Sequence, residues 1–278
     1  MGLGLGLRLG LGAPPPAPQH PLDLAELTAL PEGRRAAVTA AANEAATTLD
    51  VDPQSVIDAA GRCLEWWDWR SNTFTDAAAT VPAVQGNAIE TFRGVAKGLL
   101  ASQANAALKP VLGAGGIVCT SDLLSGTATG FPTGDANLGV VSVVDFAASQ
   151  PSSFPVPFAR AVTNNATRLL IFATTVLNAA VGSNPITFPS TANPLGRAVG
   201  SYCFYTTSPR SMSLRSDDTG ELVESVGSAP TFSGPVHIGG LPEASNTLSS
   251  CTIRQVAFTT SIADARILYP FLRALEGI

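Results

Sequence analysis

The sequence predicts a mainly β protein whose body is an antiparallel β-sandwich. From about residue 73 onward, short β-prone runs alternate with stretches rich in Gly, Pro, Asn and Ser, and no long helical segments lie between them. The length of 278 residues suits one all-β domain of ~200 to 250 residues behind an extension. We therefore expect a β domain over residues 65–278, preceded by an extended arm and short α-helices.

Residues 1–12 alternate glycine with leucine, apart from Arg8. In an extended strand this period places five leucines on one face, namely Leu3, Leu5, Leu7, Leu9 and Leu11. A lone glycine-rich strand has no ladder partner and loses much entropy on ordering. We expect residues 1–21, which include a proline-rich spacer, to form an arm whose leucines anchor it to a neighbouring subunit. A disordered low-complexity tail is an equal alternative.

Residues 22–64 predict three helices, over Leu22–Leu30, over Glu32–Leu49 and from Pro53 to about Leu64. Pro31 ends the first helix because proline lacks the backbone N–H. Asp52 caps the third helix, with Pro53 at its first position. Alanine-rich helices bury little area, so we expect them to pack against a partner or against the sandwich.

The β-prone runs define nine candidate strands: Ala88–Phe92, Gly116–Thr120, Leu138–Phe146, Arg168–Val176, Ala198–Thr207, Ser211–Arg215, Thr219–Ser225, Val236–Ile238 and Ser250–Phe258. Two of them, Leu138–Phe146 and the centre of Arg168–Val176, are almost continuously apolar. Such runs indicate inner strands covered on both faces.

The C-terminal segment closes the domain with a strand pair and a helix. The strands contain Val236–Gly240 and Thr252–Phe258, both rich in β-branched or aromatic residues. Ser261 opens the helix, with Asp264 three residues later as its capping partner.

This segment resembles the closing part of the concanavalin A-like (laminin-G-like) jelly rolls of bacteriophage structural proteins. The residues that carry the resemblance are Ile238-Gly-Gly, Ile253-Arg-Gln-Val-Ala-Phe258 and Ser261-Ile-Ala-Asp264. Leu64-Glu-Trp-Trp-Asp68 and Ala101–Pro110 look like earlier segments of the same proteins. The resemblance spans roughly residues 60 to 278.

The resemblance implies a jelly-roll β-sandwich in a virion component, assembled in the host cytoplasm and built into a tail, fibre or head appendage. Its partners would be other virion proteins, reached through the N-terminal arm, and it would form a homo-oligomer. The alternative is a module that binds host surface glycans. An enzyme that degrades polysaccharides is a third, less favoured hypothesis.

Composition limits the other classes of partner and cofactor. A net charge of −5, with Lys97 and Lys109 as the only lysines, argues against nucleic-acid binding. No run reaches the ~18 apolar residues of a membrane span. Four cysteines, Cys63, Cys119, Cys203 and Cys251, form no zinc-binding spacing. Free buried thiols are favoured over two disulfides.

Few residues offer catalytic or metal chemistry, and we expect neither a cofactor nor a metal. Asp217 and Asp218 favour a hairpin turn over a cation site, because no second acidic cluster follows. His20, beside the spacer, and His237, within a strand, favour structural roles. Glu221 and Glu224 are three positions apart, so in a strand they point to opposite faces, which disfavours paired-carboxylate catalysis.

These observations predict that the protein is not an enzyme. Trp66, Trp67 and Trp69 are the remaining candidates for a binding role, because tryptophan stacks on sugars. Clustered where the helices meet the sandwich, they favour packing at that junction, with glycan contact as the alternative.

Overall fold

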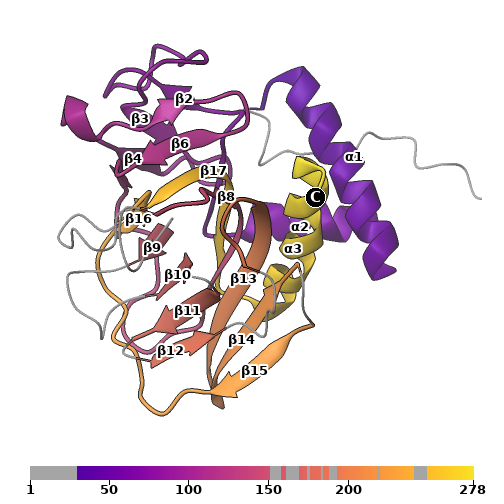
Figure 1. The fold of residues 1–278 in the computed structure, drawn as a ribbon. Helices are drawn as coiled ribbons and strands as arrows, with labels where there is room; N and C mark the ends of the chain where they lie inside the picture. The colour runs from indigo at the N-terminus through magenta and orange to yellow at the C-terminus, as the bar shows by residue number, and fades with distance from the viewer. Residues whose placement is uncertain are drawn as a thin grey trace, which may run out of the picture.

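The structure of the protein is a computed structural model that describes residues 30–150, 158–160, 169–173, 176–182, 184–187, 193–217, 220–240 and 249–278. It consists of two antiparallel β-sheets and a layer of helices (Figure 1). The predicted antiparallel β-sandwich is therefore confirmed. The arm leucines, Leu3 to Leu11, and the predicted helix up to residue 29 lie outside the described residues.

One sheet has eight strands, and we call it the helix-covered sheet. Its order is β15 (Leu222–Ser225), β14 (Arg210–Ser216), β13 (Ala198–Thr207), β8 (Leu138–Phe146), β17 (Ser250–Thr259), β6 (Ile117–Thr120) and β5 (Val111–Leu112), with β1 (Glu65–Asp68) also paired to β17. Strand β8 lies at its centre, and eight of its nine residues are buried. It is covered on both faces, as its apolar run predicts.

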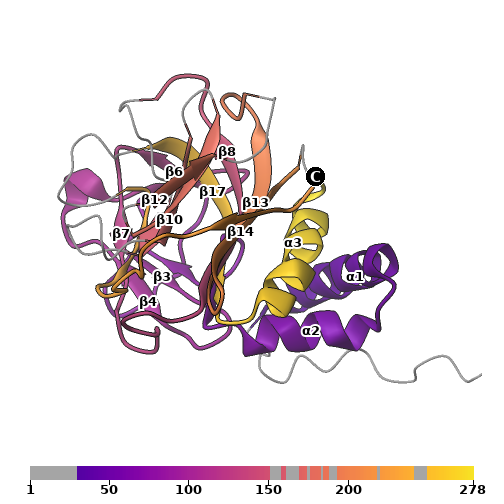
Figure 2. The same ribbon diagram turned by 90° about the horizontal axis from the view of Figure 1, so that it is seen from below.

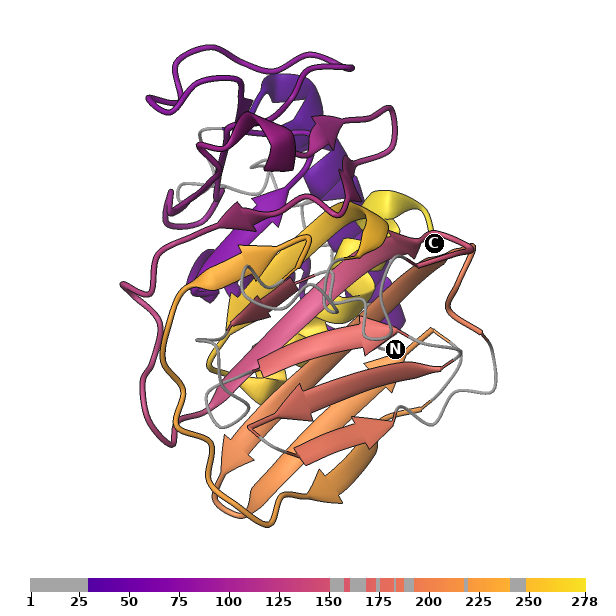
Figure 3. The ribbon, with the colours of Figure 1, turned by 60° about the vertical axis from the view of Figure 1, so that its left-hand side comes forward.

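The second sheet has nine strands. Its order is β12 (Asn184–Thr187), β11 (Leu177–Val181), β10 (Leu169–Ala173), β9 (Phe158–Arg160), β16 (Val236–Ile238), β7 (Leu124–Ser125), β4 (Leu100–Ser102), β3 (Thr91–Arg93) and β2 (Thr73–Phe74). Its strands lie over those of the helix-covered sheet (Figure 3). The main hydrophobic core fills the space between the two sheets.

Three α-helices form a layer outside the helix-covered sheet, one of them directly on its outer face and the other two packed on that helix (Figure 2). They are α1 (Glu32–Leu49), α2 (Pro53–Arg62) and α3 (Ile262–Glu276), and α3 contacts β8, β13 and β17 directly. A second hydrophobic core fills the helix–sheet interface. Helices α1 and α2 pack mainly on α3 and share this core with the sheet, so they pack against the β domain, which is one of the two partners that the sequence predicts.

The predicted helix ends agree with the capping chemistry. Asp52 accepts a hydrogen bond from the Gln54 N–H at 2.8 Å, and Pro53 is the first residue of α2. Ser261 accepts one from the Asp264 N–H at 3.1 Å at the start of α3. In the described residues, no helix has the length and apolar character that crossing a bilayer requires.

The strand predictions are confirmed at several places and incomplete at others. Strands β8, β13 and β16 have the predicted bounds, whereas β3 is shifted from the predicted Ala88–Phe92 to Thr91–Arg93. The sequence misses β1, β2, β4, β5, β7, β9, β11 and β12. These strands have two to five residues, which is too short for an alternating pattern to be readable.

Candidate functional site

Two of the three predicted glycan-contacting tryptophans are interior side chains. On β1, Trp66 packs edge-on against Phe271 of α3, with ring centroids 5.6 Å apart, and Trp67 packs edge-on against Phe258 at 6.3 Å. Their exposed fractions are 0% and 1%. Trp66 therefore fills the junction between the helices and the sandwich, Trp67 fills the core between the two sheets, and neither presents a surface to a sugar. Trp69 is half-buried and is the only one of the three at the surface.

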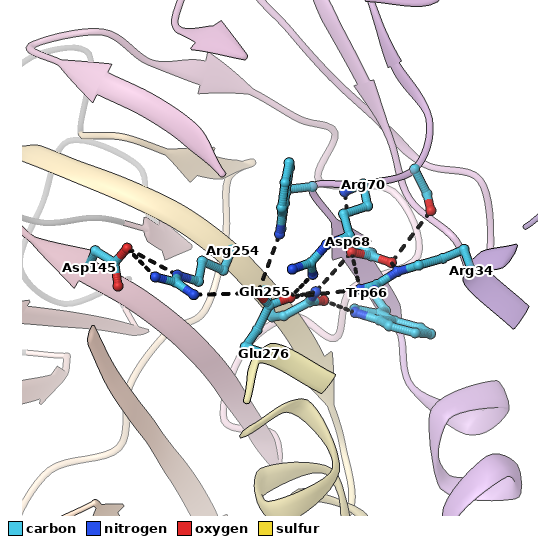
Figure 4. Close-up of polar contacts among 10 residues, drawn as sticks. Arg34, Trp66, Asp68, Arg70, Asp145, Arg254, Gln255 and Glu276 are labelled. Carbon is cyan, nitrogen blue, oxygen red and sulfur yellow. Dashed lines mark hydrogen bonds and ion pairs between the residues drawn. The ribbon is translucent and has the colours of Figure 1, made fainter. Parts of the chain in front are cut away.

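A group of charged side chains joins α3 to α1, β1 and β17. We call it the Glu276 cluster; it consists of Arg34, Asp68, Arg70, Asp145, Arg254, Gln255 and Glu276, with Trp66 and Trp69 at its edges (Figure 4). Gln255 donates hydrogen bonds to Asp68 at 2.8 Å and to Glu276 at 2.6 Å. The Trp66 indole N–H donates to the Gln255 side-chain oxygen at 2.7 Å. Hydrogen bonds and ion pairs thus join the cluster into one network.

The charges of the Glu276 cluster balance. Three guanidinium groups face three carboxylates, and the Asp68 and Glu276 side chains are fully enclosed. Arg254 lies 2.7 Å from Asp145 and 3.8 Å from Glu276. Buried charges are stable only when paired, and here each guanidinium is used by the chain's own acids. The interior of this cluster therefore has a structural role. At its rim, which reaches the surface, Arg70 stacks 4.3 Å from the Trp69 ring centroid, and the Arg254–Asp145 pair is also partly exposed.

A second charged group lies farther along the same face of the helix-covered sheet. We call it the Tyr269 cluster; it consists of Tyr202, Arg215, Asp217, Glu221, Arg266, Tyr269 and Arg273. Arg266, Tyr269 and Arg273 lie on one side of α3 because they are spaced by three and four residues. The guanidinium groups of Arg215 and Arg273 lie 4.9 and 5.5 Å from the Tyr269 ring centroid.

The carboxylates of the Tyr269 cluster hold two of its three arginines. Glu221 accepts two hydrogen bonds from Arg266, at 2.9 and 2.7 Å, and Asp217 lies 2.7 Å from Arg273. Among the described residues, Arg215 has no acidic partner and contacts the Tyr269 ring instead. This part of the Tyr269 cluster therefore carries one more positive than negative charge.

The Tyr269 cluster opens onto an exposed part of the sheet. Helix α3 covers β8, β13 and β17, and β14 and β15 continue the sheet beyond it (Figure 2). Val223 on β15 is 56% exposed, and the Arg266 side chain is 50% exposed. The half-exposed Arg266 and the exposed Val223 give this surface both polar and apolar character.

Tyr202 is the most enclosed member of the Tyr269 cluster. Its side chain is fully buried, its ring lies edge-on to that of Tyr269 at 5.7 Å, and burial raises the pKa of its phenol. The nearby Glu221 carboxylate raises that pKa further, although the phenolic oxygen has no partner in hydrogen-bonding geometry. Among the described residues, the buried Tyr202 hydroxyl therefore has no hydrogen-bond partner.

The other predicted site residues have mostly structural positions. His237 is buried, and its Nδ1 lies 2.9 Å from the Ser125 hydroxyl, which fits the predicted structural role. Glu224 is paired with the core-facing Met212, whereas Glu221 reaches α3, so these acids point to opposite faces as predicted. All four cysteines are buried with free thiols. His20 and Asp218 lie outside the described residues.

Asp217 departs from the simple turn that the sequence favours. Strands β14 and β15 form the predicted hairpin, but Asp217 also accepts hydrogen bonds from the Gly200 N–H at 2.7 Å and the Tyr269 hydroxyl at 3.1 Å. It thereby fixes α3 to β13. Within the described ranges, no three His, Cys, Asp or Glu side chains gather as a metal site would require.

The Tyr269 cluster is not predicted from the sequence. One signal for it is readable, because Arg266, Tyr269 and Arg273 have the spacing of a single helix face. Arg215 and Tyr202 are brought to that face only by the pairing of β13 with β14, where the two residues stand directly opposite.

No protein-family model and no curated protein matches this sequence. Among solved structures, the chain resembles Trypanosoma rangeli sialidase in complex with 2,3-difluorosialic acid, a covalent intermediate, with a TM-score of 0.52 and 12% identity over 87% of this chain and 38% of that one. Other matches are NanB sialidase of Streptococcus pneumoniae (TM-score 0.41, 9% identity, 53% and 26% coverage) and the CBM40 of Ruminococcus gnavus IT-sialidase bound to α2,3 sialyllactose (TM-score 0.39, 8% identity, 49% and 83% coverage).

The likeness to the T. rangeli sialidase establishes the fold, a jelly-roll, lectin-like β-sandwich, as the sequence resemblance implies. The chain spans less than two fifths of that sialidase's length. Nothing in these matches points to bacteriophage proteins.

The same comparison corrects the prediction that the protein is not an enzyme. The structure that the fold matches with a TM-score of 0.52 is a sialidase, captured as a covalent intermediate. The lack of familiar catalytic motifs in the sequence is therefore no ground for excluding catalysis, because enzymes share this fold.

Proposed function

We propose that the protein recognises glycans, and that the lectin-like sandwich binds an acidic sugar at the Tyr269 cluster. The fold is shared with a sialidase whose structure holds 2,3-difluorosialic acid. A fold alone does not assign a ligand, so the proposal depends on the surface that this chain presents. The observation that carries it is Arg215, a guanidinium beside Tyr269 with no acidic partner among the described residues.

The chemistry of this surface suits a carboxylated sugar. Arginine donates a planar pair of N–H groups that matches a carboxylate, and its stacking on Tyr269 holds that fork in place. Arg266 supplies a second, half-exposed guanidinium, already oriented by Glu221. Exposed Val223 offers an apolar surface on which the C–H face of a sugar ring packs.

The test is binding of the full-length protein to a panel of acidic and neutral glycans. We expect binding to acidic members, and an affinity loss of about tenfold or more in Arg215→Gln, because a charge-assisted hydrogen bond contributes about 1.5 to 3 kcal/mol. Arg35→Gln is the matched control, since it removes the same charge from an exposed position on α1. Equal binding of neutral and acidic glycans, or unchanged affinity in Arg215→Gln, would contradict the proposal.

Because enzymes share the fold, the bound glycans are also examined for cleavage. Glu221 is the acid closest to both Tyr202 and Arg266, so it is the position to replace. Products released by the wild type and absent with Glu221→Gln indicate turnover at the Tyr269 cluster. If glycans bind but no cleavage products form, the function of this surface is glycan binding alone.

A second proposal concerns the particle that carries the sandwich. The sequence resemblance supports a bacteriophage virion component, located in the virion and attached to other virion proteins through Leu3, Leu5, Leu7, Leu9 and Leu11. Burying five leucines contributes several kcal/mol before ordering costs, at ~25 cal/mol per Å2. Deleting residues 2–12 should abolish incorporation into particles and leave a folded sandwich. Normal incorporation of the truncated protein into particles would contradict the proposal that the arm attaches the protein to other virion proteins.

A further inference from the structure

Cys119 and Cys251 face each other across two neighbouring strands. Cys119 lies on β6, Cys251 lies on β17, and the antiparallel register places them directly opposite. Directly opposite residues point to the same face of a sheet, and both side chains lie in the core between the two sheets. Their exposed fractions are 0% and 3%, and the neighbouring Cys251 thiol raises the pKa of the Cys119 thiol.

The backbone geometry of this pair meets the requirement of a disulfide. Directly opposite residues in antiparallel strands have Cα atoms ~4.5 or ~5.5 Å apart. Disulfides join Cα atoms ~4.4 to 6.8 Å apart, so the strands need no movement to be bridged. We propose that Cys119 and Cys251 are an oxidation site, which closes as a cross-strand disulfide when the chain folds in the presence of a disulfide oxidant, either a small molecule or a protein.

The other two cysteines have no such partner. Cys203 on β13 stands opposite Val140 of β8 and Leu214 of β14. Cys63 follows α2, and its thiol donates a hydrogen bond to the Ala60 carbonyl at 2.8 Å. Four cysteines form six different pairs, and the strand register places only the Cys119–Cys251 pair directly opposite each other.

The reaction is a two-electron exchange. The two S–H bonds break and one S–S bond forms, while the two electrons and two protons reduce the oxidant disulfide to two thiols. Only the thiolate attacks a disulfide, and in the folded chain the neighbouring Cys251 thiol and burial raise the pKa of the Cys119 thiol. The bond therefore forms as β17 pairs with β6 during folding, before the core closes around both sulfurs.

The Cys251 sulfur also has a polar neighbour, Ser249. The Ser249 hydroxyl lies 3.1 Å from the Cys251 sulfur and donates or accepts a hydrogen bond there. The same hydroxyl donates to the Gly239 carbonyl at 2.9 Å, which joins it to the end of β16. A cross-link here closes a loop that contains most of the sandwich strands, so it restricts the unfolded chain strongly.

The experiment compares full-length protein produced in a reducing cytoplasm with protein exported to an oxidising bacterial periplasm. Both samples are denatured, alkylated without reduction and mapped by peptide mass spectrometry. We expect four alkylated cysteines in the first sample. In the second we expect alkylation of Cys63 and Cys203 alone, with a peptide cross-linked through Cys119 and Cys251, and an unfolding temperature higher by roughly 5 to 15 °C.

Two variants test whether oxidation is specific to the Cys119–Cys251 pair. Cys203→Ala should retain the cross-link, and Cys119→Ala should leave every remaining cysteine open to alkylation. Four alkylated cysteines in the exported wild type, or a disulfide that uses Cys63 or Cys203, would overturn the proposal. The wild-type peptide map alone decides between these results, so the proposal remains testable even if a variant fails to fold.

Discussion

Arg34 on α1 donates two hydrogen bonds to the two carboxylate oxygens of Asp68 on β1, at 2.6 and 2.7 Å. The Arg34 side chain is 7% exposed, and that of Asp68 is fully buried. This pair ties the first helix to the strand that carries Trp66 and Trp67. The helices and the sandwich are thus connected by a buried ion pair as well as by apolar packing.

Replacing Arg34 with alanine should destabilise the fold strongly. The change leaves the Asp68 carboxylate buried with only neutral donors, and it removes a cation 3.7 Å from Glu276. Removing one partner of a buried pair costs about 3 to 5 kcal/mol. The measurement is the free energy of unfolding in urea. Arg35→Ala, on the exposed side of the same helix, is the control, with an expected change of less than about 0.5 kcal/mol. Equal effects of the two variants would show that the Arg34 pair contributes nothing.

Glu65 should make stability fall as pH rises above its ordinary pKa. Its carboxylate is fully buried and accepts four backbone hydrogen bonds, from Trp66, Ala96, Lys97 and Leu99. Burial raises its pKa from 4.5, and the hydrogen bonds offset part of that shift. Between 4.5 and the raised pKa, the folded state keeps a proton that the unfolded state releases, so stability decreases with pH in that window.

Glu65→Gln tests this dependence because glutamine does not titrate. The variant loses one acceptor oxygen, which costs about 1 kcal/mol. The free energies of unfolding of wild type and variant are measured from about pH 4 to pH 8, where the linkage predicts that the wild-type advantage shrinks as pH rises. An advantage that grows with pH means that the hydrogen bonds outweigh burial and that the pKa of Glu65 is lowered.

The elements that the sequence predicts well are those with local signals. Strand β8 has a continuous apolar run, and α3 has the Ser261–Asp264 cap. Strand β1 has no such signal, because Glu65 and Asp68 flank its tryptophans and charged residues are depleted from buried strands. Both acids are buried only because the fold brings donors to them, Arg34 for Asp68 and backbone N–H groups for Glu65.

The candidate sites are harder to predict because their members are far apart in the chain. Glu276 accepts hydrogen bonds from Arg70 and Gln255, which lie on other elements. Tyr269 contacts Arg215 and Arg273, and of these only Arg273 lies on the same helix as Tyr269. The prediction that the protein is not an enzyme is wrong for a different reason. It depends on the lack of sequence motifs, whereas the catalytic residues of an enzyme can come from separate strands and leave no motif in the sequence.

Gly94→Ala should destabilise the protein through Glu65. A Cβ at Gly94 would lie 1.9 Å from the Glu65 carboxyl carbon, and the four hydrogen bonds hold that carboxylate in place. Overpacking of this kind costs about 1 to 3 kcal/mol. Gly33→Ala is the matched control, since nothing lies within 4 Å of its added Cβ in α1. It should stabilise the helix by up to about 1 kcal/mol. Thermal unfolding of the two variants should therefore shift in opposite directions, and parallel shifts would count against this account.

Replacing Trp67 and Trp69 distinguishes the contribution of these side chains to stability from a contribution to glycan binding. Trp67 is 1% exposed within the sandwich core, so Trp67→Ala should lower the free energy of unfolding by about 3 to 5 kcal/mol. Trp69 is half-buried beside Arg70, and Trp69→Ala should cost less than half as much. If the acidic sugar binds at the Tyr269 cluster, Trp69→Ala keeps wild-type affinity in the glycan panel, while Arg215→Gln loses it. The reverse result, with affinity lost only in Trp69→Ala, would place recognition at the rim of the Glu276 cluster, where Trp69 stacks with Arg70.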